Sequence, residues 1–203
     1  MSRIFMEGYG VINQHEFEQK RPIMQELSAM LLYPQESPLK QQDFPLLELY
    51  ADNNKEVAAN INRFFDYFSE LTLLQQQEYY VQTFDFNKKT PLHMTFAKYE
   101  DAKERGQILV QLKMMYAMSG LELNSKELSD HLPLMLEFLA NGEWIHANRL
   151  QKWQLLFAIM EDGTYFLYQE LKKQENPYQY VIQSVRILLK SCMELEMEAE
   201  KVE

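Results

Sequence analysis

The sequence contains a single cysteine, Cys192, in 203 residues. One thiol cannot form an internal disulfide, so a disulfide-stapled fold is excluded and a reducing compartment is favoured. The chain also lacks a Cys-x-x-Cys pair, a glycine-rich phosphate loop and a Gly-x-Ser-x-Gly motif. Zinc, nucleotide and acyl-enzyme chemistry therefore lack their usual parts, although weak nucleotide binding does not require these motifs.

Long apolar runs are also missing. A membrane helix needs roughly 20 apolar residues, and the stretch from Leu155 to Met160 is among the longest here. The first ten residues carry one arginine and no long apolar region, so they do not resemble a signal peptide. We therefore expect a cytoplasmic protein without direct membrane insertion.

Basic residues are outnumbered, with 20 Lys and Arg against 30 Asp and Glu and a net charge of −10. This balance argues against nucleic-acid binding and favours a basic or neutral partner. Glycine and proline are few, at six and seven. Several of them lie where helices are expected to stop: Pro34, Pro38, Pro45, Pro91, Gly120, Gly142, Gly163 and Pro177.

Apolar residues recur at steps of three and four in residues 57–71, 108–116, 150–160 and 178–192. This spacing is typical of amphipathic helices, each of which must bury its apolar stripe against another. The pattern predicts one all-α domain over residues 1–203, a bundle of about eight helices. We expect a mobile loop from Asp85 to His93, an N-terminal extension over 1–15 and an acidic, mobile tail over 193–203.

The segment from Leu128 to Leu139 places polar residues at the start of a helix. Ser129 or Asp130 can cap it, and Pro133 falls in the first turn, where a missing N–H costs little. Asp130 and His131 would then lie at the N-terminus of this helix, which the following apolar residues anchor to the core. Such an anchored polar N-terminus is suited to binding a ligand.

Tyr80 and Phe84 are four residues apart and share a helix face, with Asp85 at its edge. A carboxylate beside an aromatic wall suits a peptide that carries a basic residue next to an apolar one. The alternative is a helix that simply ends in an acidic residue.

Arg105 and Gly106 also allow two interpretations. They can be the solvated start of a helix whose early carboxylates favour its dipole. Glycine inside a helix costs roughly 0.5 to 1 kcal/mol relative to alanine, so Gly106 suggests close approach of another helix or a ligand.

Among the histidines, His131 is a binding candidate because of its neighbour Asp130, although a hydrogen-bonded structural role is the alternative. His15, His93 and His146 are interpreted as structural. A di-iron bundle needs two Glu-x-x-His pairs, and the chain has one, from Glu143 to His146. We therefore expect no metal site and no enzymatic activity.

Four segments in this order resemble the nitrate reductase molybdenum cofactor assembly chaperones, the NarJ family: Leu31 to Pro34, Tyr80 to Asp85, Arg105 to Gln107 and Leu128 to Leu139. The resemblance runs from about Phe17 to about Leu139. It implies an all-helical, non-catalytic chaperone for nitrate assimilation and unfolded protein binding, with no cofactor of its own. Its expected partner is the catalytic subunit of respiratory nitrate reductase, bound through the N-terminal segment and held competent for molybdenum cofactor insertion. Molybdenum cofactor delivery proteins are further expected partners.

The resemblance also implies roles for individual residues. Tyr80 and Phe84 would form the apolar wall, Asp85 and Asp130 the contact with a basic residue, and His131 a polar contact. Arg105, Gly106, Pro133 and Glu137 would support them, with Pro133 shaping the turn and touching nothing. As a hypothesis, Arg105 ties Asp85 or Asp130 into the groove by paired hydrogen bonds.

One departure concerns the loop after Asp85. Many family members have an arginine there, where this chain has Asn87, Lys88 and Lys89, and lysine does not reproduce the planar fork of arginine. Two other functions stay open, a general helical adaptor with a different client and a helical metalloenzyme. A monomer and a domain-swapped dimer are both compatible with the sequence.

Overall fold

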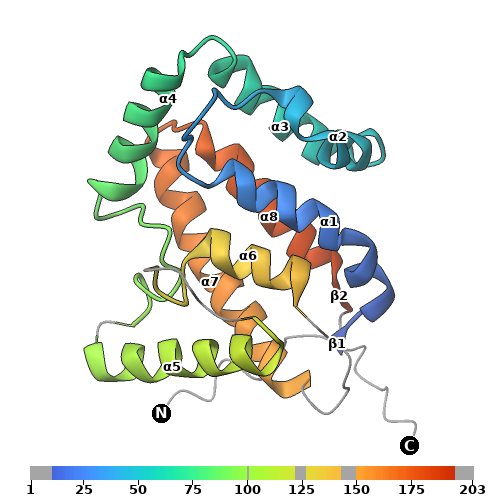
Figure 1. The fold of residues 1–203 in the computed structure, drawn as a ribbon, viewed down its shortest axis with the longest axis vertical. Coiled ribbons are helices and arrows are strands. Elements are labelled where there is room, and N and C mark those ends of the chain that lie inside the picture. The colour runs from blue at the N-terminus through green and yellow to red at the C-terminus, as the bar shows by residue number, and fades with distance from the viewer. Residues whose placement is uncertain (1–10, 100, 122–126, 143–149, 195–203) are drawn as a thin grey trace, which may run out of the picture.

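The computed structural model describes residues 11–99, 101–121, 127–142 and 150–194. Eight α-helices lie in these ranges (Figure 1), which confirms the all-α class and the expected number of helices. They are α1 (Gln14–Met30), α2 (Pro45–Asp52), α3 (Lys55–Phe68), α4 (Leu73–Tyr80), α5 (Ala102–Met118), α6 (Leu132–Asn141), α7 (Leu150–Lys173) and α8 (Tyr178–Ser191). A short 3-10 turn, η2 (Gln41–Asp43), precedes α2, and a π-helical turn, η3 (Val81–Asp85), continues α4. Along the described residues, no helix combines the length and hydrophobicity needed to cross a bilayer.

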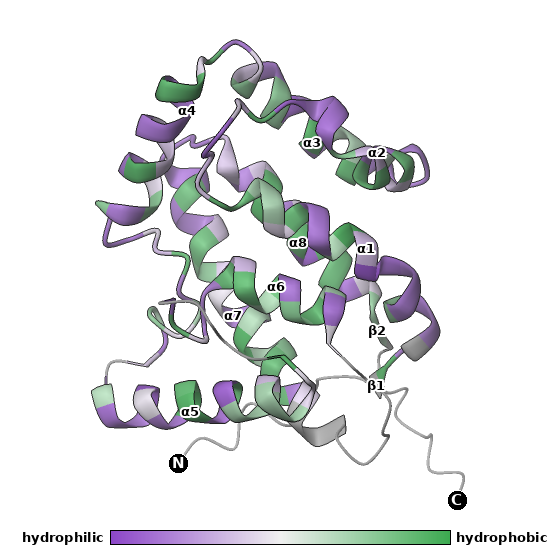
Figure 2. Ribbon diagram, viewed as in Figure 1, coloured by the Kyte–Doolittle hydropathy of each residue, from purple (hydrophilic) through white to green (hydrophobic). Residues whose placement is uncertain are grey.

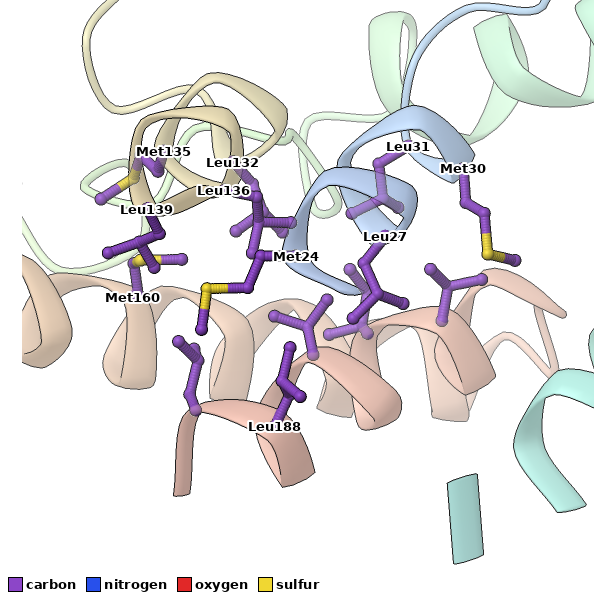
Figure 3. Close-up of a cluster of buried hydrophobic side chains, with 14 of the residues drawn as sticks. Met24, Leu27, Met30, Leu31, Leu132, Met135, Leu136, Leu139, Met160 and Leu188 are labelled. Atoms are coloured by element: carbon purple, nitrogen blue, oxygen red, sulfur yellow. The ribbon is translucent and has the colours of Figure 1, made fainter. Parts of the chain in front are cut away.

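The core forms where α1, α6, α7 and α8 pack together. The closest packing is between α1 and α6, α7 and α8, and α3 and α8. Figure 3 shows Met24 and Leu27 of α1 beside Leu136 of α6 and Leu188 of α8. Hydrophobic and hydrophilic residues alternate along the helices in Figure 2, as amphipathic helices require.

Polar side chains cap the starts of several helices. Asn13 accepts a hydrogen bond from the backbone N–H of Glu16 at the start of α1, and Asn54 and Thr72 cap α3 and α4 in the same way. Asp101 accepts from two backbone N–H groups at the start of α5. These caps satisfy donors that have no partner inside the helix.

The two ends of the described chain meet in a small strand pair. β1 (Val11–Ile12) runs antiparallel to β2 (Met193–Glu194), and the N–H of Asn13 donates to the carbonyl of Cys192 at 2.9 Å. Sequence reasoning placed 11–15 in an extension and 193–194 in a tail, and expected no strand. The structure instead pairs these residues, because the start of α1 and the end of α8 lie side by side.

The loop from Asp85 to His93 is non-helical beyond η3, as predicted. Hydrogen bonds connect it to other elements, and its expected mobility stays a prediction. The Asn87 side chain donates to Oε1 of Gln174 at 2.9 Å, and the carbonyl of Leu92 accepts from the N–H of Leu132 at 2.8 Å.

Gly163 does not end a helix, contrary to the prediction, but lies inside α7. A Cβ atom at Gly163 would be 2.6 Å from the backbone oxygen of Met94. The glycine therefore allows the segment around Met94 to touch α7. Gly106 in α5 is the opposite case, since a Cβ there would meet nothing within 4 Å. The close approach of another helix predicted at Gly106 is wrong.

These two glycines make a matched test of stability. Gly163→Ala is expected to destabilise the protein by about 1 to 3 kcal/mol, because the added methyl group overlaps backbone atoms of the neighbouring segment. Gly106→Ala is expected to stabilise it by about 0.5 to 1 kcal/mol, because it removes backbone freedom without a clash. Urea unfolding of the three proteins measures both changes, and a neutral Gly163→Ala would contradict the close contact.

Candidate functional site

The start of α6 is built differently from the prediction. His131 is the N-cap residue and makes no side-chain capping bond. Ser129, one expected cap, instead donates its hydroxyl to the carbonyl of Leu109 at 2.7 Å. Pro133 lies in the first turn, as predicted, but it is buried and its carbonyl accepts from the hydroxyl of Ser28 at 2.8 Å. The expectations that Ser129 or Asp130 caps α6 and that Pro133 touches nothing are therefore wrong.

Asp130 turns away from α6 because other donors surround its carboxylate. The N–H of Thr95 donates to Oδ2 at 3.2 Å, and the Thr95 hydroxyl donates to the same oxygen. Nδ1 of His93 lies 3.2 Å from Oδ1, and Nη2 of Arg105 lies 3.3 Å from Oδ2. The hypothesis that Arg105 holds Asp130 is confirmed, although one nitrogen makes the contact where a pair was expected.

These contacts decide the charge of Asp130. Burial alone would raise the pKa of this carboxyl, but the hydrogen bonds from His93 and Thr95 and the charges of His93 and Arg105 lower the pKa to about 2. The carboxylate is therefore ionised at neutral pH.

Asp130 has no exposed surface. A direct contact with a basic partner residue requires accessible oxygens, so this structure does not offer Asp130 for that contact. Instead, the residue holds the segment around Thr95 against the start of α6. Its backbone carbonyl contributes as well, accepting from the N–H of Met94 at 2.9 Å.

A cavity of about 220 Å³ opens beside this buried group, and we call it the acidic cavity. It is lined by Tyr33, Tyr80, Phe84, Asp85, Leu92, His93, Glu127 and His131. Four of the predicted binding residues are thus brought together, namely Tyr80, Phe84, Asp85 and His131. The other five predicted residues do not line it: Arg105, Gly106, Asp130, Pro133 and Glu137.

The aromatic wall of the acidic cavity has a buried layer and an exposed ring. Tyr80 and Phe84 are only 6% and 5% exposed, and their ring centroids lie 5.0 Å apart. Tyr33 packs edge-on against Tyr80 at 5.6 Å and is 40% exposed. Tyr33 therefore offers the accessible aromatic surface, while Tyr80 and Phe84 support it from behind.

Phe84 and Asp85 are neighbours in the π-helical turn η3, but their side chains lie in different environments. The N–H of Phe86 donates to the carbonyl of Val81 at 3.0 Å, five residues back. Within this wider turn Phe84 is buried and Asp85 is exposed. Such single π turns inside helices often occur at functional sites.

Burial and neighbouring charges shift the pKa values of two residues that line the acidic cavity. Burial, and next the nearby carboxylate of Glu127, raise the pKa of Asp85. Burial lowers the pKa of His131, as does His93, while Glu127 and Asp130 oppose the shift. Asp85 and Glu127 bring two carboxylates to the cavity, and burial disfavours the charged form of His131, so the lining favours a cation.

Sequence reasoning missed several lining residues. His93 was interpreted as structural, and it does contact Asp130, but its ring also lies 5.4 Å from that of His131 at the cavity. Tyr33 belongs to one of the recognised motifs, which could have identified it. Glu127 has no periodicity or motif that would indicate a site.

His15 does not line this cavity, and the other candidate motif is not among the described residues. His15 is exposed, and its ring is hydrogen-bonded to the side chain of Gln19 at 2.9 Å. The motif from Glu143 to His146 lies outside the described residues. In the parts of the chain that are described, no group of three or more His, Cys, Asp or Glu residues could hold a metal ion.

The known proteins that this chain resembles have names connected with nitrate reductase. The family model described as nitrate reductase delta subunit matches residues 48–173. The chain is 37% identical over 118 residues to the probable nitrate reductase molybdenum cofactor assembly chaperone NarJ of Bacillus subtilis (strain 168), covering 58% of this chain and 64% of that protein. It is 34% identical over 116 residues to the nitrate reductase molybdenum cofactor assembly chaperone NarJ of Escherichia coli (strain K12), covering 56% and 49%. The chain thus spans about half to two thirds of the length of these relatives.

The buried carboxylate predicts a pH-dependent stability. Because the folded-state pKa of Asp130 is lowered, its stabilising effect is complete above the unfolded pKa near 4 and is lost as pH falls through about 2. Asp130→Asn is therefore expected to cost about 1.5 to 3 kcal/mol at pH 7, and the difference from the natural protein should shrink between pH 4 and pH 2.

Urea unfolding at several pH values measures this difference. Asp66→Asn is a matched control, because Asp66 is exposed on α3. Its cost should stay below about 0.5 kcal/mol at pH 7. A gap between Asp130→Asn and the natural protein that stays constant down to pH 2 would exclude the proposed ionic role of Asp130.

Proposed function

The chain belongs to the nitrate reductase delta subunit family, and we propose that it acts as an assembly chaperone for a nitrate reductase. The family model matches more than half of the chain, and two relatives carry this function in their names. Those relatives are named as chaperones and not as enzymes. In this proposal the chain contributes recognition of a client subunit, and the molybdenum cofactor belongs to that client.

We further propose that the acidic cavity binds the N-terminal segment of the nitrate reductase catalytic subunit. The observation that carries this proposal is the meeting of two carboxylates, Asp85 and Glu127, with the exposed ring of Tyr33 in one cavity. A volume of about 220 Å³ has room for one long side chain. A lysine or arginine there would pair with the carboxylates and pack its stem on the ring.

The surface beside the cavity extends this recognition to apolar residues. Leu32 is 48% exposed and adjoins Tyr33 at the end of α1. A bound segment that places a basic residue in the cavity can lay an apolar neighbour on Leu32. Apolar contacts would then supply affinity, while the carboxylates would orient the segment.

The residues around Asp130 have a supporting part in this mechanism. Arg105 and Thr95 hold the Asp130 carboxylate, which in turn holds His93 at the cavity wall. Since the cavity lies at the junction of the loop and the start of α6, its shape depends on this junction. We therefore assign Asp130 and Arg105 to positioning, and Tyr33, Asp85, Glu127 and His131 to contact with the client.

Calorimetric titration with a peptide that copies the N-terminus of the catalytic subunit tests the proposal. Asp85→Asn is expected to weaken binding about tenfold, because it removes one charge-assisted hydrogen bond. A scrambled peptide should bind more weakly than the native one. Binding should also weaken on acidification at a higher pH than for an ordinary aspartate, because the pKa of Asp85 is raised.

Asp52→Asn is the matched control for this titration, because Asp52 is exposed at the end of α2 and does not line the cavity. It should bind the peptide as the natural protein does. Equal affinity for native and scrambled peptides, or equal loss in the two variants, would refute recognition by the acidic cavity. The family membership would be unaffected.

A further inference from the structure

A second and larger cavity, of about 460 Å³, lies where the loop after η3 runs along α7, and we call it the basic cavity. Its lining comes from residues 88–97 of the loop and from residues 163–173 of α7. Gly163 makes this arrangement possible, because it lets the backbone of Met94 touch the helix. Among the described residues, only His93 lines both cavities.

The basic cavity carries the opposite charge to the rest of the protein. Lys88, Lys89 and Lys173 line it against a single carboxylate, Glu170, although the chain has a net charge of −10. Lys173 is paired with Glu170 at 2.5 Å. Lys88 and Lys89 form no ion pair within the described ranges. The charge of Lys89 helps to lower the pKa of Glu170, but three ammonium groups against one carboxylate still leave the lining positive, so it attracts an anion.

Two aromatic rings also line the basic cavity. Phe96 from the loop is 47% exposed and Phe166 from α7 is 43% exposed, and both line it. Buried Met94 and Leu167 lie with them. Exposed phenyl rings offer a flat apolar surface on which a planar ring system can stack. The guanidinium of Arg105 already lies over the Phe96 ring, 5.8 Å from its centroid, so at most one face of that ring is open.

We propose that the basic cavity binds a small organic phosphate whose planar heterocycle stacks on Phe96 or Phe166 and whose phosphate is held by Lys88 and Lys89. The volume falls in the range of about 300 to 1,000 Å³ that is usual for small-molecule sites. Lysine is a common phosphate ligand that acts as a point charge. An acidic peptide would satisfy the lysines but would leave the two phenyl rings without a planar partner.

The two lysines also belong to a segment that has no part in the proposed contact with the client. Lys88 and Lys89 lie three and four residues after Asp85, the last residue of η3, and line the basic cavity, whereas Asp85 lines the acidic one. The loop therefore separates an anion site from a cation site. Phosphate binding is independent of the client proposal and can be tested without a client.

Titration of the full chain with adenosine monophosphate, as a probe of this ligand class, tests the proposal. The nucleotide is expected to bind more tightly than adenosine or inorganic phosphate, because each of those supplies only half of the contacts. The double substitution Lys88→Gln and Lys89→Gln should weaken nucleotide binding about tenfold. Phe166→Leu should weaken the nucleotide but leave the weaker binding of inorganic phosphate unchanged.

A matched double variant, Lys55→Gln and Lys113→Gln, removes two exposed lysines from α3 and α5 that do not line the cavity. It lowers the net charge equally and should bind the nucleotide as the natural protein does. Equal weakening in the two double variants would mean that general charge attracts the nucleotide, and would overturn the site. Tighter binding of a short poly-glutamate peptide than of the nucleotide, or absence of nucleotide binding, would also overturn it.

Discussion

The carboxylate of Asp130 is the group on which the arrangement of the site depends. A buried ion without partners would cost several kcal/mol, so the fold is stable only when donors reach it. Those donors come from His93 and Thr95 in the loop and Arg105 in α5. One ionised side chain thereby joins the loop, the start of α5 and the start of α6. A change in any of these donors should affect the shape of both cavities.

This junction explains why two cavities of opposite charge lie so close together. The loop from Asp85 to Ala97 is pinned to α6 through Asp130 and to α7 through the contact between Met94 and Gly163. Carboxylates and Tyr33 line the acidic cavity, whereas lysines, Phe96 and Phe166 line the basic cavity. If both proposed ligands bind, the loop keeps the basic client segment and the small anion in separate cavities, so that their charges do not neutralise each other.

Much of the fold could be predicted because amphipathic periodicity is a local property. The stripes at residues 57–71 and 178–192 correspond to α3 and α8. Arg105 was expected to bind either Asp85 or Asp130, and the structure shows that it contacts Asp130. The errors have a common physical origin. Ser129 and Asp130 do not cap α6 because distant groups compete for their side chains. Gly163 was expected to end a helix because its real neighbour, Met94, is far away in the sequence.

The sequence by itself determined the helices, the acidic balance and the family, since these depend on spacing, composition and local motifs. Tertiary structure alone decided that Asp130, which follows Ser129, is buried, while Asp85, which follows Phe84, is exposed. It also decided that His93, Tyr33 and Glu127 share a cavity, and that Lys88 and Lys89 face a different one. The physical reason is that burial and charge environment arise from segments brought together by packing, and no local pattern encodes which segments will meet.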